Sequence, residues 1–88
     1  MNPIQAALRI ALANTFFMYF KAHTYHWNVE GLNFNDYHGY FGGLYEELFD
    51  AVDPLAEHIR TAGGYAPVSV AALMSGKTID ENTDVVKD

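Results

Sequence analysis

The sequence predicts an all-α fold, a long antiparallel helical hairpin followed by a short connector helix. Apolar residues recur at helical spacing over two long stretches, about residues 3–29 and 33–62. Glycine-containing breaks at 31–32 and 63–64 separate these stretches from each other and from a weaker third segment. A chain of 88 residues is long enough for one small domain, and a core of that size favours oligomerisation.

The first helix is expected to begin at Asn2-Pro3, with Asn2 as the N-cap and Pro3 in the first turn. No breaker interrupts it before about Val29, and Gly31 ends it. Two apolar stripes run along this helix on nearly opposite faces, at about 100° per residue. One stripe contains Ile4, Leu8, Leu12, Tyr19, His23 and His26, and the other contains Ala6, Ile10, Ala13, Phe17, Phe20 and Trp27. Because both apolar faces must be buried, we expect a second chain to pack against part of this helix.

The second helix follows Gly31-Leu32, where Asn33 and Asp36 resemble a capping box with Asp in the Glu position. Gly63-Gly64 is expected to terminate this helix. Pro54 removes one backbone hydrogen bond, but the apolar stripe keeps its phase across it, so one kinked helix is favoured over two. The stripe comprises Phe41, Leu44, Leu48, Val52, Leu55, Ile59 and Ala62.

The third segment is expected to hold one short helix between Pro67 and Ser75, with Ser69 as its cap. Residues 77–88 are polar and acidic, and we interpret them as a tail or linker. The whole chain, residues 1–88, is then a single domain.

Composition excludes several classes of protein. The absence of cysteine excludes disulfides, thiolate metal sites and cysteine nucleophiles. A net charge of −6, with the few basic residues scattered, argues against DNA binding. The strongly apolar run at 11–20 is shorter than the roughly 20 residues that span a bilayer, and no signal peptide is recognisable. We therefore expect a cytoplasmic protein with no membrane association.

Residues that commonly bind metals are concentrated in the middle of the chain: His23, His26, His38, Asp53, Glu57 and His58. Each has a structural alternative. His23 lies on an apolar stripe and is more often a satisfied core histidine than a ligand. Asp53 precedes Pro54 and would suit an N-cap, and Glu57 is placed to pair with Arg60.

Spacing favours metal binding at four of these positions. Asp53 and Glu57, four residues apart, share a helix face, and His26 and His38 flank the turn between the helices at similar heights. His38 and Asp53, however, are separated by about 22 Å along one helix. A two-fold dimer with antiparallel chains would bring one chain's histidines to the other's carboxylates. Such a mixed ligand set suits iron or zinc.

The motif residues then resemble a known family, the Dps-type miniferritins of the ferritin-like superfamily. The resemblance rests on His23-Thr-Tyr-His26-Trp27-Asn28-Val29-Glu30-Gly31, Asn33-Phe34, His38, Asp53 and Ala56-Glu57-His58-Ile59-Arg60, and it covers roughly residues 8–75. It implies helical subunits in a hollow dodecamer that oxidise Fe(II), typically with hydrogen peroxide, at sites shared across two-fold interfaces. The ligands it implies are His26 and His38 of one chain and Asp53 and Glu57 of its neighbour.

The resemblance is incomplete in several respects, two of which bear directly on the candidate site and on the fold. Where the family usually has an acidic residue four positions after His38, this chain has Gly42, which removes a ligand of the second, weaker iron position. Glu46, one turn further on, is a candidate substitute, and His23 and Trp27 are candidates to support the ligands. The chain also resembles only the N-terminal half of the family's subunit, without the last two helices.

The expected function is that of a ferroxidase for iron storage, iron detoxification and peroxide protection. Fe(II)/Fe(III) would be the metal and zinc a substitute. Trp27 and Tyr37 are candidate relays of oxidising equivalents, although packing is the commoner role for such residues. The alternative is a non-catalytic helical oligomerisation protein that retained the fold.

Overall fold

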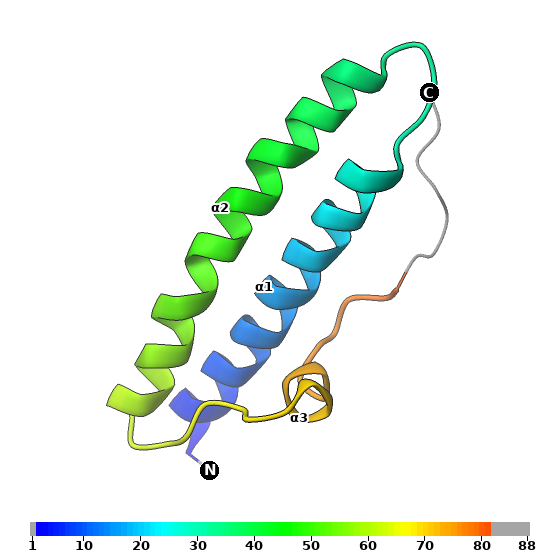
Figure 1. Ribbon diagram of the computed structural model, residues 1–88. Coiled ribbons are helices and arrows are strands. Elements are labelled where there is room, and N and C mark those ends of the chain that lie inside the picture. The colour runs from blue at the N-terminus through cyan, green and yellow to red at the C-terminus, as the bar shows by residue number, and fades with distance from the viewer. Residues whose placement is uncertain (1, 82–88) are drawn as a thin grey trace.

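A computed structural model describes residues 2–81 of the chain, and in this part it contains helices α1 (Pro3–Asn28), α2 (Phe34–Thr61) and α3 (Val70–Met74). Helices α1 and α2 lie side by side and antiparallel, joined by a short turn at one end (Figure 1). Their length gives the molecule an elongated shape, 49 × 21 × 19 Å. The predicted all-α hairpin with a short connector helix is confirmed.

The ends of α1 follow the signals in the sequence. The side-chain oxygen of Asn2 accepts a hydrogen bond of 2.8 Å from the backbone N–H of Gln5, and Pro3 occupies the first turn. The helix ends at Asn28. Gly31 then adopts a φ of +122°, a value that L side chains rarely tolerate, and so allows the chain to reverse.

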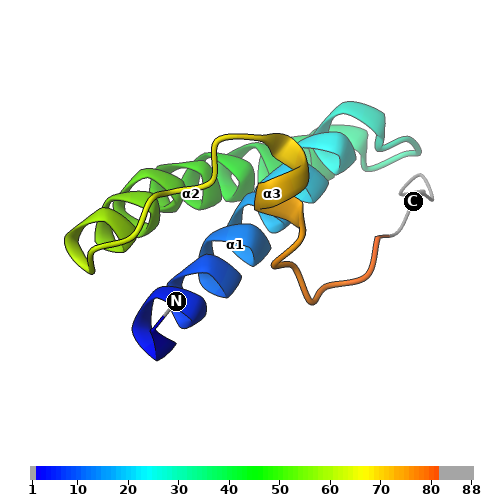
Figure 2. The same ribbon diagram turned by 90° about the horizontal axis from the view of Figure 1, so that it is seen from below.

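Helix α1 is apolar on two sides, and this chain covers it only in part. Its buried residues include Leu12 from one predicted stripe and Ala13 and Phe17 from the other, together with Ala22, which belongs to neither. Helix α2 packs along one side, and α3 contacts another (Figure 2). Three large apolar residues of α1 remain about half exposed, namely Ile10, Phe20 and Trp27. The expectation that a second chain covers this surface stays a prediction.

Helix α2 passes through Pro54 as one uninterrupted helix, as predicted. The capping box predicted at its start is wrong. Asn33 is the N-cap, but with φ −99° and ψ 30° it lacks the extended backbone of a typical cap and its side chain makes no capping hydrogen bond. The C-terminus is a Schellman motif, in which the N–H of Gly63 bonds to the carbonyl of Arg60 and that of Gly64 to the carbonyl of Ile59, both at 3.0 Å.

The segment around α3 is attached to α1. Ser69 caps α3 by accepting a hydrogen bond from the N–H of Ala72, as predicted. Beyond the helix, Asn14 and Thr78 exchange two hydrogen bonds of 2.8 and 2.9 Å. Gly76 lies so close to α1 that a Cβ there would be 3.2 Å from the carbonyl oxygen of Arg9. The beginning of the predicted tail, residues 77–88, thus contacts α1, and residues 82–88 lie outside the described residues.

No helix between residues 2 and 81 combines the length and the apolar character needed to cross a bilayer.

Candidate metal site

The two imidazoles predicted to bind metal lie against each other at the turn end of the hairpin. His26 is in the last turn of α1 and His38 in the second turn of α2, and their rings stack with centroids 3.6 Å apart. Each ring is also held by the other residue's backbone. Nδ1 of His26 lies 2.6 Å from the carbonyl oxygen of His38, and Nδ1 of His38 lies 2.7 Å from the carbonyl oxygen of His26.

These two reciprocal hydrogen bonds determine the tautomer of both rings. A carbonyl oxygen can only accept, so each Nδ1 must carry the proton and donate it. In a neutral imidazole the other nitrogen, Nε2, then presents a lone pair. Histidines that bind metals commonly donate their second ring nitrogen to a carbonyl or carboxylate in this way. The pair is therefore arranged to offer two metal-binding nitrogens, at half-buried positions.

Gly42 lies beneath this pair, one turn of α2 after His38. A Cβ atom at Gly42 would be 3.3 Å from Cε1 and 3.4 Å from Nδ1 of His26. Such distances are tighter than ordinary van der Waals contact, so any side chain at this position would require the His26 ring to shift slightly. The absence of a side chain at Gly42 thus makes room for the ring.

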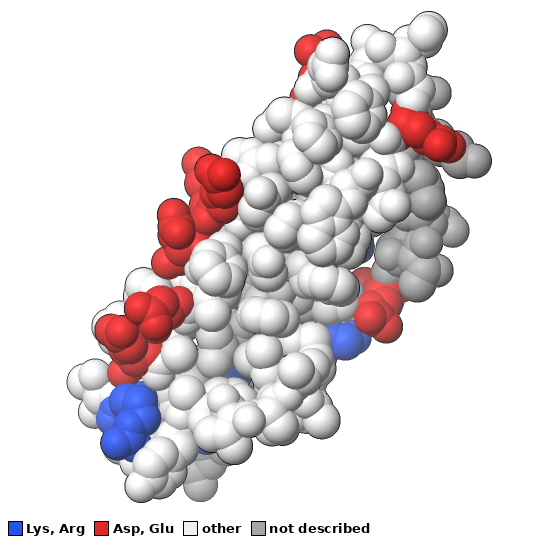
Figure 3. Space-filling model, in the orientation of Figure 1, with Lys and Arg blue, Asp and Glu red and all other residues white. Residues whose placement is uncertain are grey.

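The two predicted carboxylate ligands project from the later part of α2. Asp53 and Glu57 are both exposed, one helical turn apart. They belong to a row of acidic residues that Figure 3 shows along one edge of the molecule, and the acidic residues of this part of α2 are Glu46, Glu47, Asp50, Asp53 and Glu57.

The structure argues against the structural alternatives for the carboxylates. Helix α2 is continuous through Pro54, so Asp53 does not cap a new helix. The guanidinium of Arg60 donates to the carbonyl oxygen of Gly64 at 3.0 Å and lies over the ring of Tyr65 at 4.4 Å. Both carboxylates thus remain open to solvent.

Within one chain, the histidine pair and the carboxylate pair do not meet. His38 and Asp53 stand fifteen residues apart on a single helix, which is about 22 Å at 1.5 Å per residue. Among residues 2–81, no three His, Cys, Asp or Glu side chains come together as a potential metal-binding group. A single chain therefore carries the two halves of the predicted ligand set about 22 Å apart.

A group of aromatic rings adjoins the histidine pair. The ring of His23 stacks on that of Tyr45 with centroids 3.9 Å apart and planes only 6° from parallel. It also packs against Trp27 at 4.2 Å and accepts or donates a 3.1 Å hydrogen bond with the hydroxyl of Tyr19. Burial, and secondarily the neighbouring His26, lower the pKa of His23 below its usual value of 6.5.

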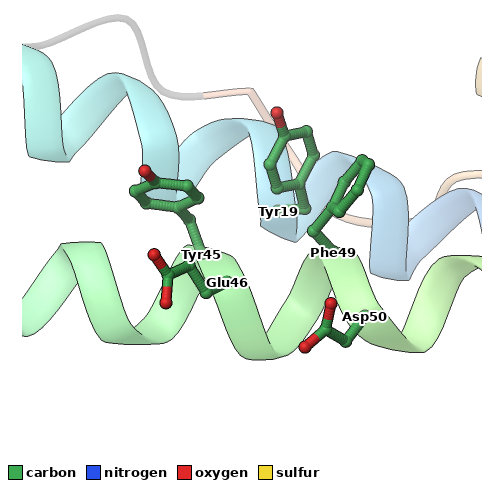
Figure 4. Close-up of a pocket in the computed structure, with 5 residues that line it drawn as sticks. All are labelled: Tyr19, Tyr45, Glu46, Phe49 and Asp50. Carbon is green, nitrogen blue, oxygen red and sulfur yellow. The ribbon is translucent and has the colours of Figure 1, made fainter.

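Of the predicted supporting residues, Trp27 and His23 lie beside the pair and Glu46 lies further away. Trp27 is 55% exposed and its ring packs against that of His23 at 4.2 Å. Glu46 follows His38 by eight residues, or about 12 Å along the helix. It lines a hollow of about 310 Å³ together with Tyr19, Tyr45, Phe49 and Asp50 (Figure 4).

The sequence analysis did not identify Tyr19 and Tyr45 as the residues that contact the ring of His23. Tyr19 lies four residues before His23, a spacing that places both side chains on the same helix face and could have identified the pair. Tyr45 comes from α2, and the sequence offers no sign that its ring would stack on His23. Tyr37, the tyrosine considered as a relay, is 41% exposed near the start of α2.

Comparison with known proteins assigns the fold to a family. Residues 5–87 match the ferritin-like domain model. The chain is 34% identical over 82 residues to a DNA protection during starvation protein of Halobacterium salinarum, covering 93% of this chain and 45% of that protein. It is 36% identical over 80 residues to a protein of the same name from Brevibacillus brevis, covering 91% and 54%. The chain thus spans about half the length of these curated relatives.

Solved structures agree with the sequence matches. The Dps protein from Vibrio cholerae O1, described as a member of a superfamily of ferritin-like diiron-carboxylate proteins, superposes with a TM-score of 0.86 at 30% identity, covering 100% of this chain and 58% of that one. A Dps protein from Bacillus brevis gives 0.83 at 33% identity, covering 99% and 62%. The chain belongs to the ferritin-like family and matches about half of a Dps-type miniferritin subunit.

Proposed function

We propose that this chain forms part of a miniferritin-type ferroxidase that binds and oxidises Fe(II). The observation that carries the proposal is the reciprocal hydrogen bonding of His26 and His38. Both rings are fixed by backbone carbonyls with their Nε2 lone pairs available, at half-buried positions. A stacked imidazole pair that served only for packing would not require both rings to adopt the same ligand-ready tautomer.

Iron is the substrate in this proposal, and zinc is a redox-inert substitute. Nε2 of His26 and of His38 would supply neutral donors, and Asp53 and Glu57 of a second copy would supply anionic oxygens. Mixed imidazole and carboxylate sets suit iron, and negative ligands favour the loss of an electron from Fe(II). Two ferrous ions would each give up one electron, and these two electrons together with two protons would reduce one hydrogen peroxide to two water molecules.

A shared site also follows from the separation of the two ligand pairs. Since about 22 Å separates His38 from Asp53 in one chain, a two-fold dimer with antiparallel α2 helices would complete two equivalent sites. The exposed apolar residues of α1 supply surface for such contacts. We infer a homo-oligomer in which this dimer is a building unit, extending to a dodecameric shell of the kind that the family resemblance implies.

The biological role that accords with this chemistry is iron storage and detoxification in the cytoplasm. Removing Fe(II) together with peroxide prevents the formation of hydroxyl radicals. The curated relatives from Halobacterium salinarum and Brevibacillus brevis carry names that refer to the protection of DNA during starvation. For this chain we propose chemical protection through iron oxidation rather than through binding of DNA, because its net charge is −6.

A mixing experiment tests the shared site. His38→Ala and Asp53→Ala each remove a different half, so each variant alone should lose iron oxidation in every site. When the two variants are mixed before assembly, a mixed dimer carries both defects in one site and none in the other. Activity should therefore return on mixing, and His58→Ala, a change at an exposed histidine of α2, should remain active throughout.

Two outcomes would contradict the proposal. If native mass spectrometry shows mixed assembly but no activity returns, the ligands do not come from two chains. If the unmodified protein assembles but neither binds nor oxidises Fe(II), the non-catalytic oligomerisation protein is the correct interpretation. A well-folded monomer at micromolar concentration would exclude the shared site before any activity is measured.

A further inference from the structure

Three aromatic rings make up much of the lining of the hollow between α1 and α2 (Figure 4). Tyr19 projects from α1, and Tyr45 and Phe49 project one turn apart from α2. The ring of Tyr19 lies 5.1 Å from that of Phe49 and 6.3 Å from that of Tyr45, with interplanar angles of 53° and 60°. Rings inclined in this way form walls around a space instead of closing it as a stack. The volume of about 310 Å³ is that of a small ligand site.

The neighbours of these rings leave aromatic faces, not polar atoms, to a ligand. One face of Tyr45 is covered by the ring of His23, whose plane is 6° from parallel, so only the opposite face can line the hollow. The hydroxyl of Tyr19 is engaged at 3.1 Å by Nδ1 of His23. Phe49 is 54% exposed and carries no polar side-chain atom. Because the face of an aromatic ring is negative, it attracts a cation within about 6 Å of its centroid.

Two carboxylates lie at the edge of the hollow, on the side formed by α2. Glu46 and Asp50 are four residues apart and share a helix face, and both are exposed (Figure 4). Within residues 2–81 no Lys or Arg pairs with either of them. The basic side chains of this part of the chain contact other groups, namely Arg9, Lys21, Arg60 and Lys77. Both negative charges are therefore available to a cation in the hollow.

We propose that this hollow binds a small organic cation with a methylated ammonium head. Such a head has no N–H group, so it needs no hydrogen-bond acceptor and packs its methyl groups on ring faces. The carboxylates of Glu46 and Asp50 attract its charge from the edge. A hard metal ion would instead require a shell of oxygen ligands, which the three rings do not supply. Binding of this cation involves neither iron nor oxidation, so the proposal is independent of the ferroxidase function.

The first test compares ligands that differ in charge. Choline chloride is titrated into the assembled protein, with sodium chloride holding the ionic strength constant, and binding is followed by saturation-transfer NMR. Choline should bind saturably. Its neutral tert-butyl analogue, in which carbon replaces the nitrogen, has the same shape and should bind about tenfold more weakly. Equal binding of the neutral analogue, or no saturable binding of choline, would overturn the proposal.

Other charged ligands test the choice of a methylated head. Glycine betaine carries the same head and a carboxylate, so Glu46 and Asp50 should repel it and it should bind more weakly than choline. Putrescine, a primary diamine, should also bind more weakly, because its N–H groups find few acceptors among the rings. Tighter binding of putrescine would contradict the methylated head. Displacement of choline by Mg(II) at equal ionic strength would show that the carboxylates hold an inorganic cation, and the proposal would be wrong.

Substitution of Phe49 tests the aromatic wall. Phe49→Leu keeps an apolar side chain without a π face and should weaken choline binding about fivefold. Phe49→Trp should bind choline at least as tightly as the unmodified protein, since indole attracts cations most strongly among these rings. Tyr40→Leu is the matched control, because Tyr40 is an exposed aromatic residue of α2 that does not line the hollow. Unchanged affinity in a folded Phe49→Leu variant would refute the aromatic site.

Substitution of the carboxylates tests the electrostatic part. Glu46→Gln and Asp50→Asn should each weaken choline binding several-fold at low salt and less at high salt, because the interaction acts through solvent. Glu47→Gln is the control, since Glu47 is an exposed neighbour on α2 outside the hollow. An equal loss in Glu47→Gln would mean that the net charge of the protein, and not this hollow, attracts choline.

Discussion

The two halves of the candidate site are built differently. At the turn end of the hairpin, His26 and His38 are half-buried, stacked at 3.6 Å and each bonded to the other's backbone. In the last third of α2, Asp53 and Glu57 are exposed and held only by their own helix. One half is preorganised within the chain, and the other is presented to solvent.

The difference follows from the ligand chemistry. A neutral imidazole binds a metal through one nitrogen in one direction, so its tautomer and ring orientation must be set beforehand. A carboxylate has two oxygens and a full charge, so it is well solvated when unbound and can reorient when a cation binds. A helix hairpin can fix the first kind of ligand internally because the turn brings two backbones together. The same hairpin does not fix the exposed carboxylates, which remain available to a site on a neighbouring chain.

The largest expected effect comes from breaking the preorganised half. His26→Ala removes a predicted ligand and also the ring that stacks on His38, although the backbone carbonyl of residue 26 that accepts from Nδ1 of His38 remains, whereas Glu57→Ala removes only one exposed carboxylate. His26→Ala should therefore weaken Zn(II) binding, measured by calorimetry, by more than about tenfold, and by more than Glu57→Ala does. A larger loss from Glu57→Ala would show that the carboxylate half governs affinity.

Substitution of Gly42 can add a carboxylate ligand next to the His26–His38 pair. The unmodified protein should bind nearer one than two Fe(II) per chain, and Gly42→Asp should add a second binding step. Because a Cβ at this position lies 3.3 Å from Cε1 of His26, the first step should weaken slightly. Gly42→Ala introduces the same crowding without a carboxylate, so it should weaken the first step and add none. A second step in Gly42→Ala, or none in Gly42→Asp, would contradict the ligand argument.

A smaller effect is expected on the pH dependence of stability. Burial lowers the pKa of His23, so the unfolded chain takes up a proton on that residue before the folded chain does. The neutral form of His23 therefore contributes fully to the free energy of unfolding above about pH 6.5, and this contribution is lost as the pH falls below that value. In His23→Gln the melting temperature should vary less with pH in this range than in the unmodified protein. His58→Gln, at an exposed position, should leave the pH dependence unchanged. Identical profiles of melting temperature against pH for His23→Gln and the unmodified protein would contradict this role of His23.

No effect at all is expected on DNA. The net charge of −6 and the acidic row along α2 oppose contact with phosphates (Figure 3). Purified protein should leave a duplex unshifted in a gel near about 150 mM salt. A clear shift would mean that the exposed acidic half of the molecule is covered in the assembly and that another surface binds DNA.

Local sequence signals predicted the elements well because each depends on neighbouring residues. Asn2 and Pro3 mark the start of α1, Gly63 supplies the left-handed conformation that ends α2, and Ser69 caps α3. The capping box at Asn33 failed for a tertiary reason: the tight turn sets the backbone of Asn33 outside the extended conformation that a cap requires.

For the candidate site, spacing alone indicated which side chains could act together and that His38 and Asp53 could not meet in one chain. These conclusions depend only on the regular rise of a helix. The reciprocal hydrogen bonds of His26 and His38, the contact of Gly42 with His26 and the stacking of Tyr45 on His23 depended on how α1 and α2 pack. Sequence periodicity defines the face of a helix on which a residue lies, whereas the rotation and height of one helix against another are decided by packing of side chains from both.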